Sequence, residues 1–133
     1  KLIIWDLEGK DDPRSKFFAT SLDKAEGYML VADVTRPDTL DVVKGLFSAI
    51  ERQRKEERVQ KKDSPAGTGC LPCVLLINKQ DLLQSPMVTN HASEVFGEGA
   101  KIFETSAKTG EKVNKAFECL ARQMLEVDKT NRK

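Results

Sequence analysis

The chain has 133 residues, which suits one domain with a substantial core. Charged residues make up 32% and hydrophobic residues 39%, a balance that excludes an intrinsically disordered chain, and the formal net charge of +1 gives no general attraction to nucleic acid or to an anionic membrane surface. No apolar run in this sequence approaches the roughly 18 residues of a transmembrane helix, and no cleavable signal pattern is present. The three cysteines cannot all pair with one another, so we expect reduced thiols and a cytoplasmic setting.

Four short apolar runs are expected to form strands: Leu2–Trp5, Tyr28–Val34, Cys73–Ile77 and Lys101–Thr105. Stretches with helical periodicity separate them, and this alternation predicts an α/β fold with a doubly wound, mostly parallel sheet and helices on both faces. The second and third runs hardly alternate between apolar and polar residues, which fits strands covered on both faces. We expect Trp5 to be a core residue.

Helices are expected in three stretches outside these strands. Arg14–Lys24 is expected to form a short helix after a loop. A longer helix is expected from Pro37, because a proline suits the first turn and Asp38 and Asp41 favour the amino-terminal end of the helix dipole. It continues into a highly charged segment that is either a solvated helix end or a partner-binding patch. The last helix is expected from about Glu111 to Val127.

The strongest chemical signal follows the strand that ends at Ile77. Asn78, Lys79 and Asp81 come at its carboxyl end, the edge at which open α/β sheets bind ligands. A carboxylate at the position of Asp81 can accept hydrogen bonds from the N1–H and the exocyclic amine of guanine, whereas adenine offers no such pair of donors. The aliphatic stem of Lys79 can cover one face of a base, and Asn78 can tie adjacent loops together.

A second short loop, after the run Lys101–Thr105, has a similar position. A small residue at Ala107 would let its backbone N–H approach a purine carbonyl oxygen, and Lys108 could pack against the base from the other side. The alternative is an ordinary loop that ends in a helix cap at Ser106 or Thr109.

The third element is the start of the chain. Asp6 ends the first expected strand, where a carboxylate can hold a Mg²⁺-bound water, and Gly9 can present its backbone N–H to a terminal phosphate. An isolated Asp-x-x-Gly is more often a simple turn. Three such motifs in order, each at the end of a predicted strand, favour one nucleotide site.

Taken in order, WDLEG, ADVT, NKQD and ETSAK resemble the motifs of Ras-type small GTPases. VADVTRPDTL and FETSAK are Rab-like, while NKQDLL is also similar to the Arf branch. The resemblance covers essentially the whole chain. It implies a P-loop NTPase-like G domain that binds GTP or GDP with Mg²⁺, acts as a switch in vesicle traffic or signalling, and works through effector and regulatory proteins.

The resemblance also implies roles for individual residues. Asp6 would help to hold Mg²⁺, and Gly9 would sense the γ-phosphate. The base pocket would consist of two groups from the two later motifs: Asn78, Lys79 and Asp81, and Ser106, Ala107 and Lys108.

One departure from the family is a missing motif. No Gly-x-x-x-x-Gly-Lys-[Ser/Thr] occurs in the sequence, so the loop that holds the α- and β-phosphates is absent from these residues. We therefore expect residues 1–133 to be a partial, N-terminally truncated G domain, from the switch II strand to the last helix, and to bind GTP weakly by themselves. No lipidation cysteine ends the sequence, so membrane association is expected only through a lipidated tail outside it.

A second departure concerns hydrolysis. Lys10 follows Gly9, where hydrolysing members usually carry a glutamine. A neutral amide can both donate to and accept from the attacking water, whereas an ammonium group can only donate. Glu8 also replaces a small residue, so intrinsic hydrolysis is expected to be slow or absent. The alternative function is a pseudo-GTPase, a protein–protein interaction scaffold without nucleotide turnover.

Overall fold

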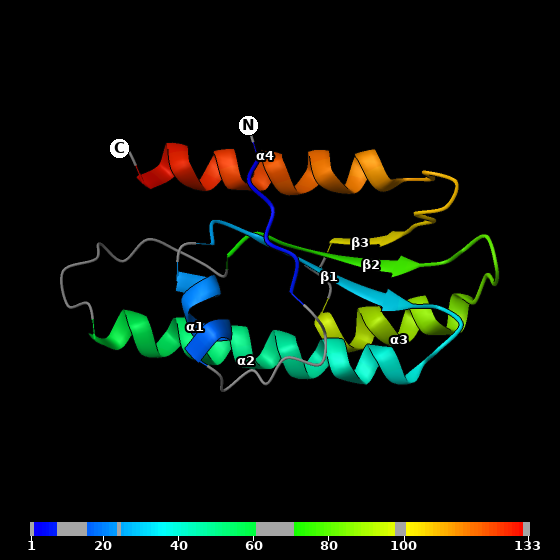
Figure 1. Cartoon of the computed structure of the whole chain (residues 1–133), viewed down its shortest axis with the longest axis horizontal. Helices are drawn as coiled ribbons and strands as arrows, with labels where there is room; N and C mark the ends of the chain where they lie inside the picture. Colours follow the sequence, from blue (N-terminus) through cyan, green and yellow to red (C-terminus); the bar gives the residue numbers. More distant parts are fainter. Residues whose placement is uncertain (1, 8–15, 24, 61–70, 98–100, 132–133) are drawn as a thin grey trace.

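The computed structural model describes residues 2–7, 16–23, 25–60, 71–97 and 101–131. Its strands are β1 (Tyr28–Asp33), β2 (Cys73–Asn78) and β3 (Lys101–Glu104), and they form one parallel sheet in the order β1-β2-β3. Its helices are α1 (Lys16–Asp23), α2 (Asp38–Gln60), α3 (Pro86–Phe96) and α4 (Val113–Asn131). Helix α4 lies on one face of the sheet, and α2 and α3 lie on the other (Figure 1). This open, parallel α/β sheet confirms the predicted fold class.

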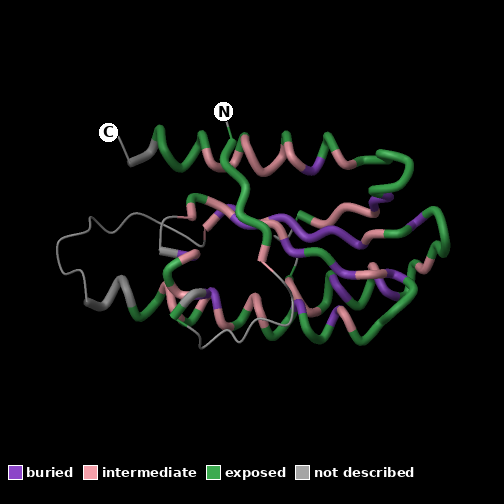
Figure 2. Tube along the Cα trace, in the orientation of Figure 1, coloured by how far each residue is buried: buried purple, intermediate pink, exposed green. Residues whose placement is uncertain are grey.

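The central strand explains why the sheet forms. All four residues of β2 between its two ends are buried, because helices cover both of its faces (Figure 2). Strand β1 differs from this expectation. Its residues facing α2 are buried, but Val31 on the other face is 53% exposed, since α4 lies over β2 rather than over β1.

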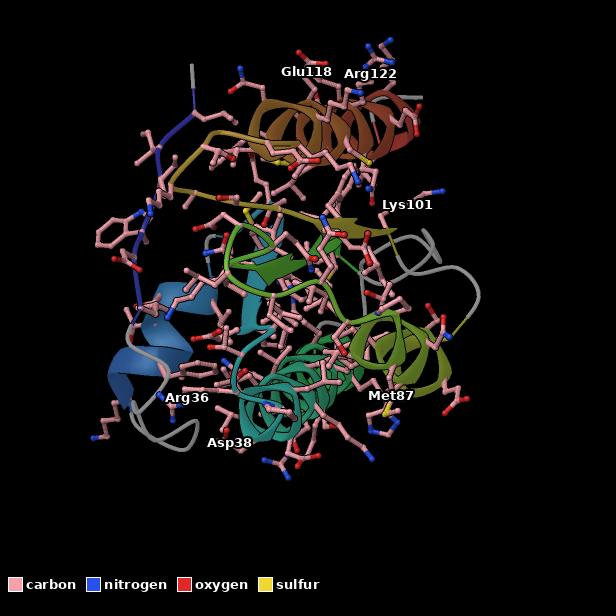
Figure 3. All side chains as sticks on the ribbon, turned by 90° about the vertical axis from the view of Figure 1, so that its right-hand side faces the viewer. Arg36, Asp38, Met87, Lys101, Glu118 and Arg122 are labelled. Carbon is pink, nitrogen blue, oxygen red and sulfur yellow. The ribbon has the colours of Figure 1, made fainter. Side chains whose placement is uncertain are left out.

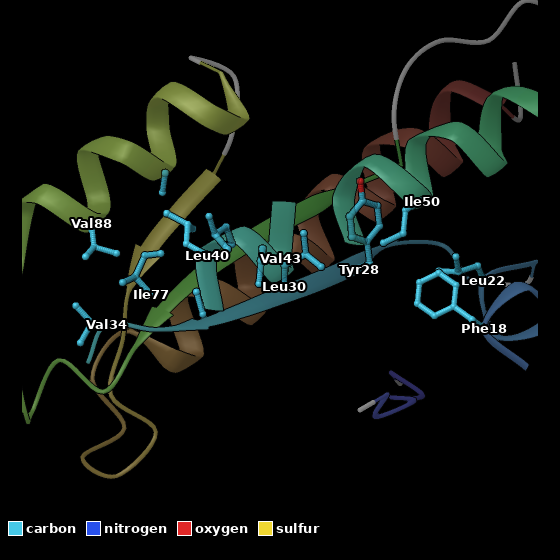
Figure 4. Close-up of a cluster of buried hydrophobic side chains, with 13 residues drawn as sticks. Phe18, Leu22, Tyr28, Leu30, Val34, Leu40, Val43, Ile50, Ile77 and Val88 are labelled. Atoms are coloured by element: carbon cyan, nitrogen blue, oxygen red, sulfur yellow. The ribbon is translucent and has the colours of Figure 1, made fainter. Parts of the chain in front are cut away.

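The core fills the space between β1, β2 and helices α1, α2 and α3 (Figure 4). Leu40, Val43 and Ile50 of α2 recur at helical spacing and pack there against β1. Helix α1 adds Phe18 and Leu22, and it is tied to α2 by a hydrogen bond of 3.3 Å from Gln53 Nε2 to the carbonyl oxygen of Ala19.

The ends of the helices follow local chemistry. Asp38 and Asp41 lie in the first turn of α2, where carboxylates are favourable to the helix dipole. Pro86 begins α3, and Gly97 ends it with a φ of 82°, a left-handed value that glycine adopts at little cost. Figure 3 shows Glu118 and Arg122 of α4 pointing away from the sheet. In the part of the chain that is described, no helix is both long and apolar enough to cross a bilayer.

Two predictions about the start of the chain are wrong. Residues 2–7 form no strand, and Ile3, Ile4 and Trp5 are 78%, 68% and 73% exposed, so Trp5 is not a core residue. The physical reason is that a strand is stabilised by hydrogen bonds to a neighbour. No described residue pairs with this segment, and none pairs with the edge of β1 that faces away from β2.

Candidate functional site

The predicted base-binding residues come together at the carboxyl edge of the sheet. Asn78 is the last residue of β2, and Lys79 to Asp81 follow it directly. Ser106 to Lys108 follow β3, whose carboxyl end lies beside that of β2 because the strands are parallel neighbours (Figure 1). The two loops that follow these strands therefore lie side by side.

Backbone hydrogen bonds hold the two loops in register. The N–H of Thr105 donates to the carbonyl oxygen of Ile77 at 2.9 Å, and the N–H of Gln80 donates to the carbonyl oxygen of Thr105 at 3.1 Å. Gln80 is buried, and its Nε2 donates to the same carbonyl of Ile77 at 3.2 Å. Gln80, at the variable position of Asn-Lys-x-Asp, thus stabilises the loop through hydrogen bonds, a role that the sequence pattern did not reveal.

Asn78 ties the loops through its side chain. Its Oδ1 accepts a hydrogen bond of 3.0 Å from the N–H of Ala107 and one of 3.3 Å from Oγ1 of Thr105. The expectation that this asparagine joins adjacent loops is confirmed. The same contacts fix the direction of the Ala107 N–H, the group expected to approach a purine carbonyl oxygen.

Asp81 is oriented by a buried serine. Ser106 is fully buried, and its Oγ donates to Oδ1 of Asp81 at 2.6 Å while accepting from the N–H of Thr109 at 3.2 Å. Within the described residues Oδ2 of Asp81 has no hydrogen-bond partner, and the residue is exposed. A carboxylate that is held through one oxygen, and whose other oxygen has no partner, can accept hydrogen bonds from the donors on the edge of a planar base.

Lys79 is fixed at both its backbone and its side chain. Its φ of 70° lies in the left-handed region, which is uncommon for a residue with a side chain. Its carbonyl oxygen accepts from the N–H of Leu82 at 2.9 Å, and its Nζ lies 2.6 Å from Oδ2 of Asp33 at the end of β1. The sequence pattern indicated no role for Asp33, although this residue lies near the end of a predicted strand.

The carboxylate of Asp33 has several donors. Thr35 donates to its Oδ1 through both the backbone N–H, at 2.9 Å, and Oγ1, at 2.6 Å. Burial alone would raise the pKa of Asp33, but the hydrogen bonds from Lys79 and Thr35 and the charge of Lys79 outweigh it and hold the pKa below its ordinary value. Asp33 is therefore ionised at neutral pH and forms an ion pair with Lys79.

The remaining predicted site residues are less constrained. Lys108 is exposed, and no hydrogen bond or ion pair joins it to another described residue. Asp6 is exposed in the segment 2–7, while Gly9 and Lys10 lie outside the described residues. No group of three or more potential ligands among the described residues could hold a metal ion. One carboxylate still fits Mg²⁺, because this ion keeps several waters and is bound through one or two carboxylates together with phosphate oxygens.

Comparison with known proteins decides the family. A sequence model of the Ras family matches residues 1–126. The chain belongs to the Ras family. It is 29% identical over 126 residues to the Ras-related protein Rab-26 of Mus musculus, with 93% of this chain and 43% of that protein covered.

Two further relatives are slightly more similar in sequence. Identity is 32% over 135 residues to the GTP-binding protein ypt5 of Schizosaccharomyces pombe, covering 98% of this chain and 57% of that protein. It is 32% over 136 residues to the Ras-related protein Rab-8B of Homo sapiens, covering 100% of this chain and 58% of that protein. The chain thus spans about half the length of these three relatives. Its resemblance to Rab proteins is confirmed by Rab-26 and Rab-8B.

Proposed function

We propose that the protein is a guanine-nucleotide-binding switch in vesicle traffic or signalling. The observation that carries the proposal is the arrangement of Asp81, whose Oδ1 accepts from buried Ser106 while Oδ2 stays open. Guanine offers N1–H and an exocyclic amine side by side, and a fixed carboxylate matches both. Adenine would leave this acceptor without a matching pair of donors, so the arrangement favours GTP or GDP over adenine nucleotides.

The other residues of the site would surround the base. The aliphatic stem of Lys79 would cover one face, and Lys108, which has no described partner, would be free to pack on the other. The N–H of Ala107 donates to Asn78 Oδ1 and would also approach the base carbonyl oxygen, since one N–H can be shared between two acceptors. Nucleotide binding would thus use groups that the loops already hold in place.

Phosphate and metal binding are assigned from the family pattern. Asp6 would hold Mg²⁺ through water, and Gly9 would contact the γ-phosphate. Bound Mg²⁺ neutralises charge on the phosphate oxygens. No residue in this sequence matches the loop that holds the α- and β-phosphates, so residues 1–133 alone are expected to bind GTP weakly.

Slow hydrolysis is part of the proposal. Lys10 stands where hydrolysing members usually carry glutamine, and an ammonium group cannot accept a hydrogen bond from the attacking water. The same residue favours the second candidate, a pseudo-GTPase scaffold that binds effector and regulatory proteins without turnover. In either case the protein would be cytoplasmic.

The base assignment is tested by changing Asp81 in the intact protein. Asp81→Asn should weaken GDP binding and improve binding of xanthosine diphosphate, because the amide side chain matches the acceptor that xanthine presents in place of the guanine amine. We expect a change in the ratio of the two affinities of about a hundredfold or more. Calorimetric titration with both nucleotides measures it. Asp41→Asn, at an exposed aspartate on α2, should leave the ratio unchanged, and an unchanged ratio in Asp81→Asn would refute the assignment.

A further inference from the structure

Asp33 links the end of β1 to the proposed base-binding loop. It is paired in register with Asn78, the last residue of β2, so its side chain lies beside the turn that begins at Lys79. The ion pair between Asp33 Oδ2 and Lys79 Nζ measures 2.6 Å. The Asp33 side chain is only 15% exposed, whereas that of Lys79 is 48% exposed, so the anchor is shielded while much of the lysine faces solvent.

The carboxylate is itself held in place. Its other oxygen accepts two hydrogen bonds from Thr35, at 2.9 and 2.6 Å, and the backbone N–H of Asp33 donates to Oγ1 of Thr39 at 2.9 Å. The two donors from Thr35 orient the carboxylate independently of Lys79, so the position of Lys79 Nζ is set by the end of β1 and the turn after it rather than by the loop that carries the lysine.

The backbone conformation of Lys79 also indicates that this residue is held in place by its surroundings. A left-handed residue with a side chain costs free energy and persists only where its surroundings hold it. The backbone of Lys79 is held by hydrogen bonds from Leu82 and Leu83 to its carbonyl oxygen, at 2.9 and 3.4 Å, and its ammonium group is held by Asp33. The four-carbon stem between them is therefore fixed at both ends, which removes most of the rotamer freedom that a free lysine would lose on covering a base.

We propose that Asp33 is a positioning residue of the nucleotide site, which holds the Lys79 stem in the place where it covers the guanine base. This inference rests on the proposed guanine-nucleotide binding. It predicts that Asp33 affects nucleotide affinity only through Lys79 and that it does not affect the choice between bases, because a stem over the face of the ring contacts all purines alike.

The test is a double-mutant cycle on the intact protein with GDP as the probe. Asp33→Asn keeps an oxygen that can accept from Thr35 but removes the charge that holds Lys79, and it should weaken GDP binding about tenfold. Lys79→Ala should also weaken binding. The double variant should then bind GDP within about twofold of Lys79→Ala alone, since the effect of Asp33 requires the lysine. Independent, additive effects would overturn the proposal.

A matched control removes another carboxylate near the end of β1. Asp38 forms an ion pair of 3.2 Å with Arg36, and both side chains are exposed at 68% and 65% (Figure 3). Asp38→Asn should leave GDP affinity unchanged, because this pair is not connected to Lys79. Thermal unfolding of every variant shows whether it is folded.

A spectroscopic measurement separates positioning from a purely structural role. In the protein labelled with ¹⁵N-lysine, the ammonium signal of Lys79 should exchange slowly with water in the wild type and rapidly in Asp33→Asn. Equal exchange in the two proteins would contradict the proposal even if GDP affinity fell. If the wild-type protein binds no GDP, both the proposed function and this inference are overturned. If it binds GDP but the effects of Asp33→Asn and Lys79→Ala are additive, the inference alone is overturned.

Discussion

Ser106 offers a sensitive test of how the two loops are joined. Ser106→Ala removes the 2.6 Å hydrogen bond to Asp81 Oδ1 and leaves the N–H of Thr109 without its acceptor at 3.2 Å. A hydrogen bond to a charged group is worth about 1.5–3 kcal/mol and a neutral one about 1 kcal/mol. Asp81 and Thr109 are both exposed, so water can replace much of what each loses. We therefore expect the free energy of unfolding to fall by about 1.5 kcal/mol.

Urea unfolding of the intact protein measures this change, and GDP titration measures its effect on binding. Since Asp81 loses the contact that orients it, GDP affinity should fall about tenfold. Ser48→Ala, at an exposed position within α2, is the control and should change the free energy of unfolding by no more than about 0.5 kcal/mol. A free energy of unfolding for Ser106→Ala that matches the wild type would refute the reasoning.

Two further predictions concern charge. Lys10→Gln should raise the single-turnover rate of GTP hydrolysis in the intact protein, because the amide can accept a hydrogen bond from the attacking water; an unchanged rate would exclude Lys10 as the cause of slow hydrolysis. The folded-state pKa of Asp33 lies below 3.8, so its ion pair stabilises the protein above that pH and the contribution is lost as the pH falls through the folded value. The difference in unfolding free energy between wild type and Asp33→Asn should thus be constant from about pH 5 to 7 and shrink below pH 3.8, and a difference that grows in acid would contradict this.

The sequence predicted those parts of the fold that depend on local pattern. The unbroken apolar run of β2 predicted a strand buried on both faces, and the spacing of apolar residues predicted α2 and α4 to within a few residues. The motifs after β2 and β3 were placed at one edge of the sheet because parallel strands present their carboxyl ends together.

What the sequence did not reveal depends on partners elsewhere in the chain. Leu2–Trp5 has the composition of a strand, but composition cannot supply the neighbouring strand, and Trp5 is exposed as a result. The pairing of Asp33 with Lys79 depends on the register between β1 and β2. Gln80 occupies the variable position of its motif, so no pattern marked its buried contact with Ile77.

Guanine recognition by the wild-type intact protein is the most direct test of the proposed function. Calorimetric titration with GDP and with ADP compares the two bases on the same diphosphate. If Asp81 and the Ser106–Lys108 loop recognise guanine, GDP binds at least about a hundredfold more tightly than ADP. Equal affinity for the two nucleotides, or no binding of GDP, would contradict guanine recognition at this site.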